Sequence, residues 1–198
     1  MGNIQELIET ALTSTGRAGI DDLIEHLRAI GFYDAPASTK YHGAYKGALA
    51  EHSYNVLQCA LKLANAWLDK ETVNKMYNSI VISALLHDLG KAGQYGKPLY
   101  VDNILKTGQS KAQPFKINDE LMSLDHEIVS VIEASKYIEL TEEEQHAIIF
   151  HNGLYTNIGR YSLQGKETPL QMIIHFADLW ASRVVESKKE RGEDILTK

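Results

Sequence analysis

The sequence predicts an all-α domain that carries one small β-hairpin insertion. Apolar residues recur at helical spacing along most of the 198-residue chain. One stretch, about residues 95–119, breaks that spacing with glycine, proline and short apolar pieces. The chain is long enough for one full hydrophobic core and too short for two comfortable ones. We therefore expect a single domain over residues 1–198.

The first two expected helices form an N-terminal pair within residues 1–34. Apolar residues at helical spacing predict helices over about residues 3–13 and 20–30. The second begins with acidic residues in its first turn, where the helix dipole favours them, and Gly31 ends it. We expect this pair to pack on the remainder of the domain.

Two longer helices follow a loop that contains Pro36. The first is expected over about residues 46–68, with an apolar face that includes Leu49 and Trp67. The second is expected over about residues 72–89 and becomes continuously apolar at "SIVISALL". A helix that is apolar on all sides is typical of a protein core.

The β-hairpin is expected from two short strands, about residues 99–105 and 112–117, that turn at "TGQS". Helical spacing resumes over about residues 123–137 and again over about 141–151. The latter begins with "TEEE", which matches the capping-box pattern of a helix start.

A Gly- and Asn-rich loop precedes the last expected helix, over about residues 168–188. Its apolar face includes Phe176 and Trp180. The polar tail that follows is expected to be solvated.

Composition excludes several classes of partner. The formal net charge of −6 argues against a broad electrostatic grip on long nucleic acid or an anionic membrane. The chain has one cysteine, no signal-peptide pattern at its start and no apolar run near the ~20 residues that span a bilayer. We therefore expect a cytoplasmic protein that binds neither membrane nor long nucleic acid.

The segment "SALLHDLGKAG" contains the first candidate functional residues, His87 and Asp88. They adjoin a run expected to be buried, where a carboxylate needs a cation or a dense hydrogen-bond network. In one interpretation Asp88 pairs with Lys91, three residues further along the same helical face. In the other, His87 and Asp88 both bind a metal ion.

Four further residues of ligand type lie at helix ends or on apolar helical segments: His52, His126, His151 and Asp178. They come from different helices, and facing helices commonly build metal sites in all-α proteins. Histidine and aspartate together suit a first-row divalent ion. Six ligands would also suffice for two ions that share a bridging carboxylate.

The order of these residues resembles a known family. "LLHDLGK", with the upstream "GALAEHS" and the downstream "HFADLWA", is similar to the HD superfamily of metal-dependent phosphohydrolases. The resemblance covers residues 40–187, the expected metal-binding core, and implies a helical HD-domain bundle. "YHGAYKGALAEHS" further resembles the HD domain attached to certain 3′-to-5′ exoribonucleases and small stand-alone HD proteins of bacteria and phages. No nucleic-acid-binding β-barrel is expected, so exoribonuclease activity is not carried over.

The resemblance implies a dinuclear centre and a role for each ligand. His52, His87, Asp88 and Asp178 would hold one metal ion. Asp88 would bridge to a second ion held by His126 and His151, and a metal-activated hydroxide would attack phosphorus. The ions would be two divalent cations among Mn, Fe, Co, Ni, Zn and Mg.

Other residues are candidates for supporting roles. Lys91 is placed to orient Asp88 or to contact a phosphate; the alternative is an ordinary cation at a helix end. His175 shares a helical face with Asp178 and is expected to support that ligand from outside. The candidate substrate-binding residues are His42, Lys46, Arg160 and Lys166. For Lys46, Arg160 and Lys166, the alternative is an ordinary charged residue on the surface.

The sequence thus predicts a metal-dependent phosphohydrolase that cleaves a phosphate ester of a nucleotide or similar small molecule. One alternative is a dinuclear iron oxygenase of the HD type, which would use the same kind of ligand set. Another is a non-catalytic nucleotide-binding regulatory module. The substrate, the metal and the oligomeric state stay open at this stage.

Overall fold

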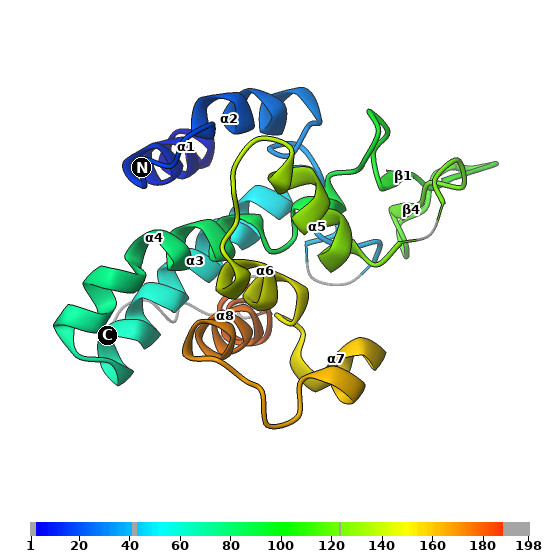
Figure 1. Ribbon diagram of the computed structural model, residues 1–198. Helices are drawn as coiled ribbons and strands as arrows, with labels where there is room; N and C mark the ends of the chain where they lie inside the picture. The colour runs from blue at the N-terminus through cyan, green and yellow to red at the C-terminus, as the bar shows by residue number, and fades with distance from the viewer. Residues whose placement is uncertain (1–2, 41–42, 123, 188–198) are drawn as a thin grey trace.

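Two long helices form the centre of the fold. The computed structural model describes residues 3–40, 43–122 and 124–187. Helix α3 (Ala48–Trp67) and helix α4 (Lys70–Leu86) are joined by two residues and pack along each other. They run through the middle of the molecule, between the other helices (Figure 1).

The N-terminal helices α1 (Ile4–Ser14) and α2 (Ile20–Ala29) cover one side of this central pair. Their buried side chains Ile8, Leu12, Leu23 and Leu27 belong to the same apolar core as α3 and α4. The expected N-terminal pair is therefore present and packs on the remainder of the chain.

Three further helices complete the body: α5 (His126–Ser135), α6 (Glu142–Ile149) and α8 (Pro169–Trp180). Helix α6 begins with the expected capping box, in which Thr141 and Glu144 each bond the backbone of the other. Helix α8 packs against α3, α4 and α6. A π-helix, η3 (Ala181–Glu186), continues it and brings Glu186 back beside α3.

The β insertion extends outward from the helical body (Figure 1). Strand β1 (Tyr100–Asp102) pairs antiparallel with β4 (Phe115–Ile117). Within this pair, β2 (Ile104–Leu105) pairs with β3 (Gly108–Gln109). An antiparallel hairpin is present as expected, but it consists of two nested pairs instead of one continuous ladder. Gly108 and Gln109, which were expected in the turn, form strand β3.

The end of α4 differs from the expectation. The α-helix ends at Leu86, His87 is its C-cap, and Asp88 has a non-helical backbone with φ −106° and ψ 12°. A 3₁₀ turn, η1 (Leu89–Lys91), follows and contains Gly90. The α-helix therefore ends before the expected residue 89, and the two ligand candidates are separated by a backbone bend and not by a regular helical step.

Three other expectations were wrong. The Gly- and Asn-rich loop contains a 3₁₀ turn, η2 (Gly153–Tyr155), and a short helix, α7 (Asn157–Ser162), whose N-cap Thr156 bonds the backbone of Gly159. Trp67 and Trp180 are also more than half exposed. Trp67 is the last residue of α3, and Trp180 is the last α-helical residue before η3; Trp67 keeps an edge contact with the ring of Phe176.

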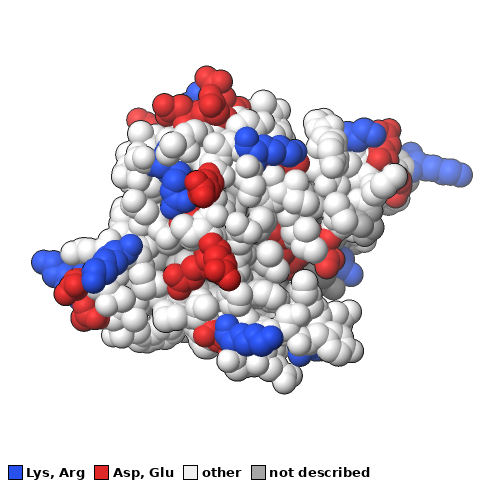
Figure 2. All heavy atoms as spheres, in the orientation of Figure 1, with Lys and Arg blue, Asp and Glu red and all other residues white. Residues whose placement is uncertain are grey.

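The exposed charges are mixed in sign. On the face shown in Figure 2, lysine and arginine side chains lie among aspartates and glutamates and do not gather into one basic surface. In the part of the chain that is described, no helix combines the length and apolarity needed to cross a membrane.

Candidate metal centre

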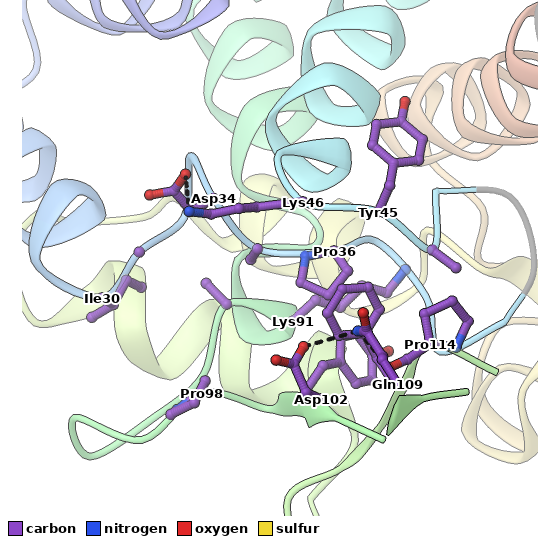
Figure 3. Close-up of a pocket in the computed structure, with 16 residues that line it drawn as sticks. Ile30, Asp34, Pro36, Tyr45, Lys46, Lys91, Pro98, Asp102, Gln109 and Pro114 are labelled. Carbon is purple, nitrogen blue, oxygen red and sulfur yellow. Dashed lines mark hydrogen bonds and ion pairs between the residues drawn. The ribbon is translucent and has the colours of Figure 1, made fainter. Parts of the chain in front are cut away.

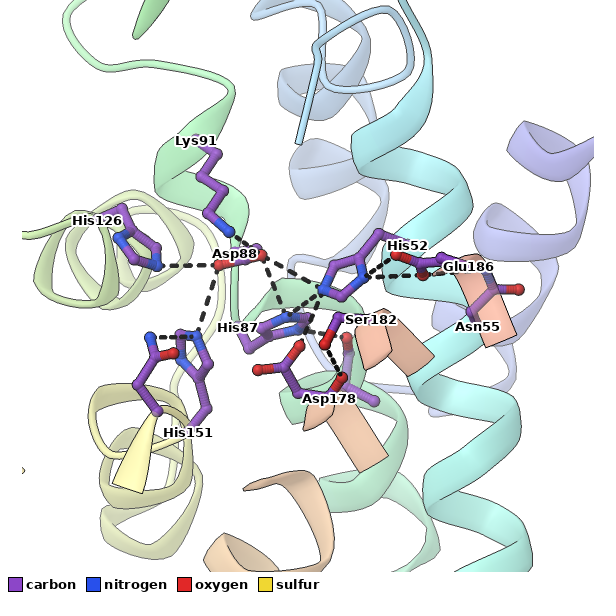
Figure 4. A network of polar contacts seen from close by, with 12 residues as sticks. His52, Asn55, His87, Asp88, Lys91, His126, His151, Asp178, Ser182 and Glu186 are labelled. Carbon is purple, nitrogen blue, oxygen red and sulfur yellow. Dashed lines mark hydrogen bonds and ion pairs between the residues drawn. The ribbon is translucent and has the colours of Figure 1, made fainter. Parts of the chain in front are cut away.

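The six predicted ligands converge from five helical segments. His52 lies in the second turn of α3, His87 and Asp88 lie at the end of α4, and His126 is the first residue of α5. His151 follows α6 by two residues, and Asp178 lies in α8. Figure 4 shows all six side chains directed toward a common centre.

Asp88 occupies the middle of this cluster and is 1 % exposed. Its Oδ1 lies 3.1 Å from His126 Nε2 and 3.6 Å from His151 Nε2. Its Oδ2 lies 3.3 Å from His87 Nε2 and 3.5 Å from His52 Nε2. The two oxygens of one carboxylate therefore face two different pairs of imidazoles.

Asp178 completes the group on the Oδ2 side. Its Oδ1 lies 3.1 Å from His52 Nε2, which is itself 3.3 Å from His87 Nε2. His52, His87 and Asp178 each offer one ligand atom within 4.8 Å of the others, and so do His87, Asp88 and His151. These spacings are those of donors able to surround a cation.

The outer nitrogens of His87 and His151 are each held by a backbone carbonyl. His87 Nδ1 donates to the Ala84 carbonyl at 2.9 Å, and His151 Nδ1 donates to the Ile148 carbonyl at 2.8 Å. Both imidazoles, when neutral, then carry a lone pair on Nε2 and direct it at the centre. Metal-binding histidines usually show this arrangement of an anchored outer N–H.

Two atoms of the cluster are buried without a hydrogen bond among the described residues, Asp88 Oδ1 and His126 Nε2. They lie 3.1 Å apart, yet their orientation does not satisfy a hydrogen bond. Leaving such groups unpaired is costly in a protein interior. A cation between them would satisfy both, so the donor set fits a metal ion on this side.

Burial, hydrogen bonds and neighbouring charges together shift the pKa values of the cluster residues. Burial opposes ionisation of Asp88, but the charges of Lys91 and His87 hold its pKa well below the ordinary value. Burial would lower the pKa of His52, but hydrogen bonds to Asp178 and Glu186 raise it to about 10. Burial and then the charge of His87 lower the pKa of His151 to about 3.

Several outer residues were not predicted from the sequence. Glu186 accepts from His52 Nδ1 at 3.0 Å and from the Asn55 amide at 3.1 Å. Glu127 lies 3.2 Å from His126 Nδ1 and could itself join His126 and His151 around an ion. Only its position next to His126 could have marked Glu127 in the sequence.

Asn152 connects His151 with Glu127, the neighbour of His126, on the side of the cluster that Asp88 Oδ1 faces. Its amide donates to Glu127 Oε1 at 2.8 Å and to His151 Nε2 at 2.9 Å. The second bond occupies the nitrogen that faces the centre. The Asn152 amide must therefore move away before His151 can bind a cation.

The structure places Lys91 directly on Asp88. Its Nζ lies 2.6 Å from Asp88 Oδ2, and its side chain is 19 % exposed. The expected ion pair between residues three positions apart is confirmed, and it coexists with the histidine contacts. The carboxylate raises the pKa of Lys91, against the effect of burial, so the amine stays charged at the edge of the cluster.

The other supporting candidates that the structure describes do not contact the cluster side chains, although Lys46 lines a pocket that Lys91 also lines. His175 Nδ1 donates to the His151 carbonyl at 2.7 Å, so it contacts the backbone of a different ligand and not Asp178. Lys46 pairs loosely with Asp34 on the surface. Arg160 is exposed and bonds the Leu154 carbonyl, Lys166 is exposed, and His42 lies outside the described residues.

The comparison with family models supplies the decisive observation. The model of the HD domain family matches residues 49–181, a span that includes all six converging residues. This chain belongs to the HD domain family. HD domains bind divalent metals, and the described residues of this HD domain contain histidine and aspartate groups able to hold them.

One curated relative is similar over a shorter segment. It is the dihydroneopterin 2′,3′-cyclic phosphate phosphodiesterase of Methanocaldococcus jannaschii, 38% identical over 66 residues. The match covers 33% of this chain and 26% of that protein, so only about a quarter of the relative's length is spanned. No solved structure matches this HD domain.

Proposed function

We propose that this HD protein hydrolyses phosphate esters of small molecules such as nucleotides, with two divalent metal ions as cofactors. The observation that carries the proposal is the position of Asp88. One buried carboxylate faces His126 and His151 with one oxygen and His52 and His87 with the other. Such a carboxylate is placed to bridge two ions.

Bound divalent ions would activate a water molecule and neutralise charge that develops on the phosphate oxygens. The protein's own contribution is to orient and anchor the ligands. The outer nitrogens of His87 and His151 are fixed by backbone carbonyls, and His52 is fixed by Glu186. We assign Lys91 to hold Asp88 in place and to present a positive charge toward a phosphate.

The relative supports the same reaction class. That protein is a phosphodiesterase of a 2′,3′-cyclic phosphate. Cyclic phosphodiesters are therefore candidate substrates of this chain, together with phosphomonoesters.

The test is a panel of phosphomonoesters, linear phosphodiesters and 2′,3′-cyclic phosphates incubated with protein reconstituted with Mn²⁺, Co²⁺, Fe²⁺ or Zn²⁺. We expect release of phosphate, or ring opening, that depends on the added metal and is removed by a chelator. Oxygen consumption with Fe²⁺ and no phosphate chemistry with any metal would instead support the oxygenase. Nucleotide binding without turnover would support the regulatory module.

A further inference from the structure

A pocket of about 760 Å³ lies beside the candidate metal centre. Its walls come from the loop before α3, the turn η1 and the β insertion (Figure 3). Pockets that hold small ligands commonly have volumes of about 300–1,000 Å³. The space is therefore large enough for a nucleoside.

Flat apolar side chains form much of the wall. Prolines from three separate segments line the pocket, Pro36, Pro98 and Pro114, together with Tyr100 and Phe115. The backbone of Phe115 donates to the Thr39 carbonyl at 3.3 Å, which ties the insertion to the loop on the opposite side. Planar faces held in this way suit the faces of a planar ring.

One side of the pocket carries hydrogen-bonding groups. Gln109 donates from its amide to Asp102 Oδ1 at 3.1 Å and to the Pro114 carbonyl at 3.0 Å. Asp102 is exposed where it lines the pocket, and Oδ1 is the oxygen that accepts from Gln109. A carboxylate oxygen can only accept at neutral pH, so its partner must present N–H or O–H groups.

Lys91 connects the pocket with the metal centre. Its side chain lines the pocket, and its Nζ contacts Asp88 Oδ2 at 2.6 Å. Figure 3 shows Lys91, Asp102 and Gln109 among the residues that line the pocket. A group attached to a phosphate at the metal centre can therefore extend past Lys91 into this space.

We propose that this pocket binds the heterocyclic base of the substrate, and that the base is of the guanine type, with adjacent N–H donors. The inference rests on the proposed function and specifies its substrate class. The prolines and aromatic rings contact the faces of the base. Asp102, held by Gln109, accepts hydrogen bonds from its donor edge.

Calorimetric binding of guanosine to the Mn²⁺-loaded protein tests the proposal without any chemical step. We expect guanosine to bind and inosine, which lacks the exocyclic amino group, to bind more weakly. Asp102→Ala should weaken guanosine binding at least about tenfold, the effect of one hydrogen bond to a charged group. Asp119→Ala is the matched control, because it removes an exposed carboxylate of the same insertion that does not line the pocket.

Failure of guanosine to bind, or equal effects of Asp102→Ala and Asp119→Ala, would overturn the pocket assignment. Hydrolysis assays separate this outcome from failure of the proposed function. Equal KM values for glycerol phosphate and guanosine phosphates would leave the hydrolase standing and overturn the base pocket. Guanosine binding that depends on Asp102, without hydrolysis of any phosphoester, would keep the pocket and overturn the hydrolase.

Discussion

At the scale of single residues, the candidate metal centre depends on the carboxylate of Asp88. This group is surrounded by the Lys91 amine and by imidazole nitrogens. Asp88 is buried, contacts Lys91 at 2.6 Å and lies within 3.6 Å of four imidazoles. Its ionised form is strongly favoured, as the depressed pKa indicates. A negative charge in this place would attract divalent cations.

The first prediction therefore concerns Asp88→Asn, which keeps the shape of the side chain and removes its charge. We expect the variant to lose both metal ions and all phosphoester hydrolysis, because one oxygen becomes an amide donor. Elemental analysis after gel filtration measures the metal content. Asp119→Asn is the control and should retain wild-type metal. Full occupancy and turnover in Asp88→Asn would exclude the bridging role.

The second prediction concerns Glu127, whose carboxylate lies beside His126 and accepts from Asn152. Glu127→Gln should weaken binding of the ion on the Oδ1 side by about 10–100-fold, the usual effect of removing an outer partner of a ligand. The ion on the Oδ2 side should stay. Metal titration resolves the two sites, with exposed Glu142→Gln as control. Equal weakening of both sites would contradict the assignment.

At the scale of elements, the ligands are positioned by the contact of η1 with α5. Gly90 donates its backbone N–H to Ser130 Oγ at 2.8 Å, and Ser130 Oγ donates to the His126 carbonyl. A methyl group on Gly90 would lie 2.3 Å from that carbonyl oxygen and 2.9 Å from Val129 Cβ. Only glycine permits this close approach.

The third prediction follows from that contact. Gly90→Ala should destabilise the protein by about 1–3 kcal/mol, the typical cost of overpacking. Because α5 must shift, binding of the ion near His126 should weaken as well. Thermal denaturation and metal titration measure the two effects. Gly96→Ala is the control, since a Cβ at Gly96 meets nothing within 4 Å, although its φ of +72° adds backbone strain. Unchanged metal binding in Gly90→Ala would refute the coupling.

A second contact joins the loop between α1 and α2 to helices α4 and α6. Glu144 is completely buried and accepts from Arg17 at 2.6 Å and from Ser79 at 2.7 Å. Burial alone would raise its pKa, but Arg17 and the other donors keep the pKa below its ordinary value of 4.5. The Glu144 carboxylate therefore binds a proton less readily in the folded state than in the unfolded state.

The fourth prediction is a pH dependence of stability. Since the pKa is lowered by folding, the contribution of Glu144 is complete above about pH 4.5 and is lost as the pH falls through the folded-state pKa. Glu144→Gln should cost about 3 kcal/mol at neutral pH, because it breaks a buried pair. The difference from wild type should shrink in acid. Urea denaturation at several pH values checks this, and a constant difference would contradict it.

At the scale of the whole molecule, one apolar core includes residues from the N-terminal helices and from the metal-binding helices. Leu12 and Leu27 are completely buried and belong to the same cluster as Leu85 and Ile174. A continuous core of this kind favours cooperative unfolding. We propose that the N-terminal pair and the metal-binding core form one domain.

The fifth prediction tests that proposal by native-state hydrogen exchange. Amides of α1 and α2 should exchange through the same global opening as those of α3 and α4. Metal ions bind only the folded state, so saturating Mn²⁺ should slow exchange in all four helices equally. Protection that rises in α3 and α4 alone would show that the N-terminal pair unfolds as a separate unit.

The sequence by itself determined the helical class, the presence of a small β insertion and the family. Helical spacing and capping are local properties, so Thr141 and the apolar run of α4 could be interpreted directly. The order His52, His87-Asp88 and Asp178 was equally visible, because the family pattern is a pattern of residue types along the chain.

The tertiary structure decided the geometry of the centre. His52 and Glu186 are 134 residues apart, and Asn152 and Glu127 are 25 apart, so no local pattern relates them. The bend after Leu86, which turns the two oxygens of Asp88 toward different histidines, depends on the packing of η1 against α5. Distances between side chains on separate helices are set by how those helices pack, and packing is a property of the folded chain alone.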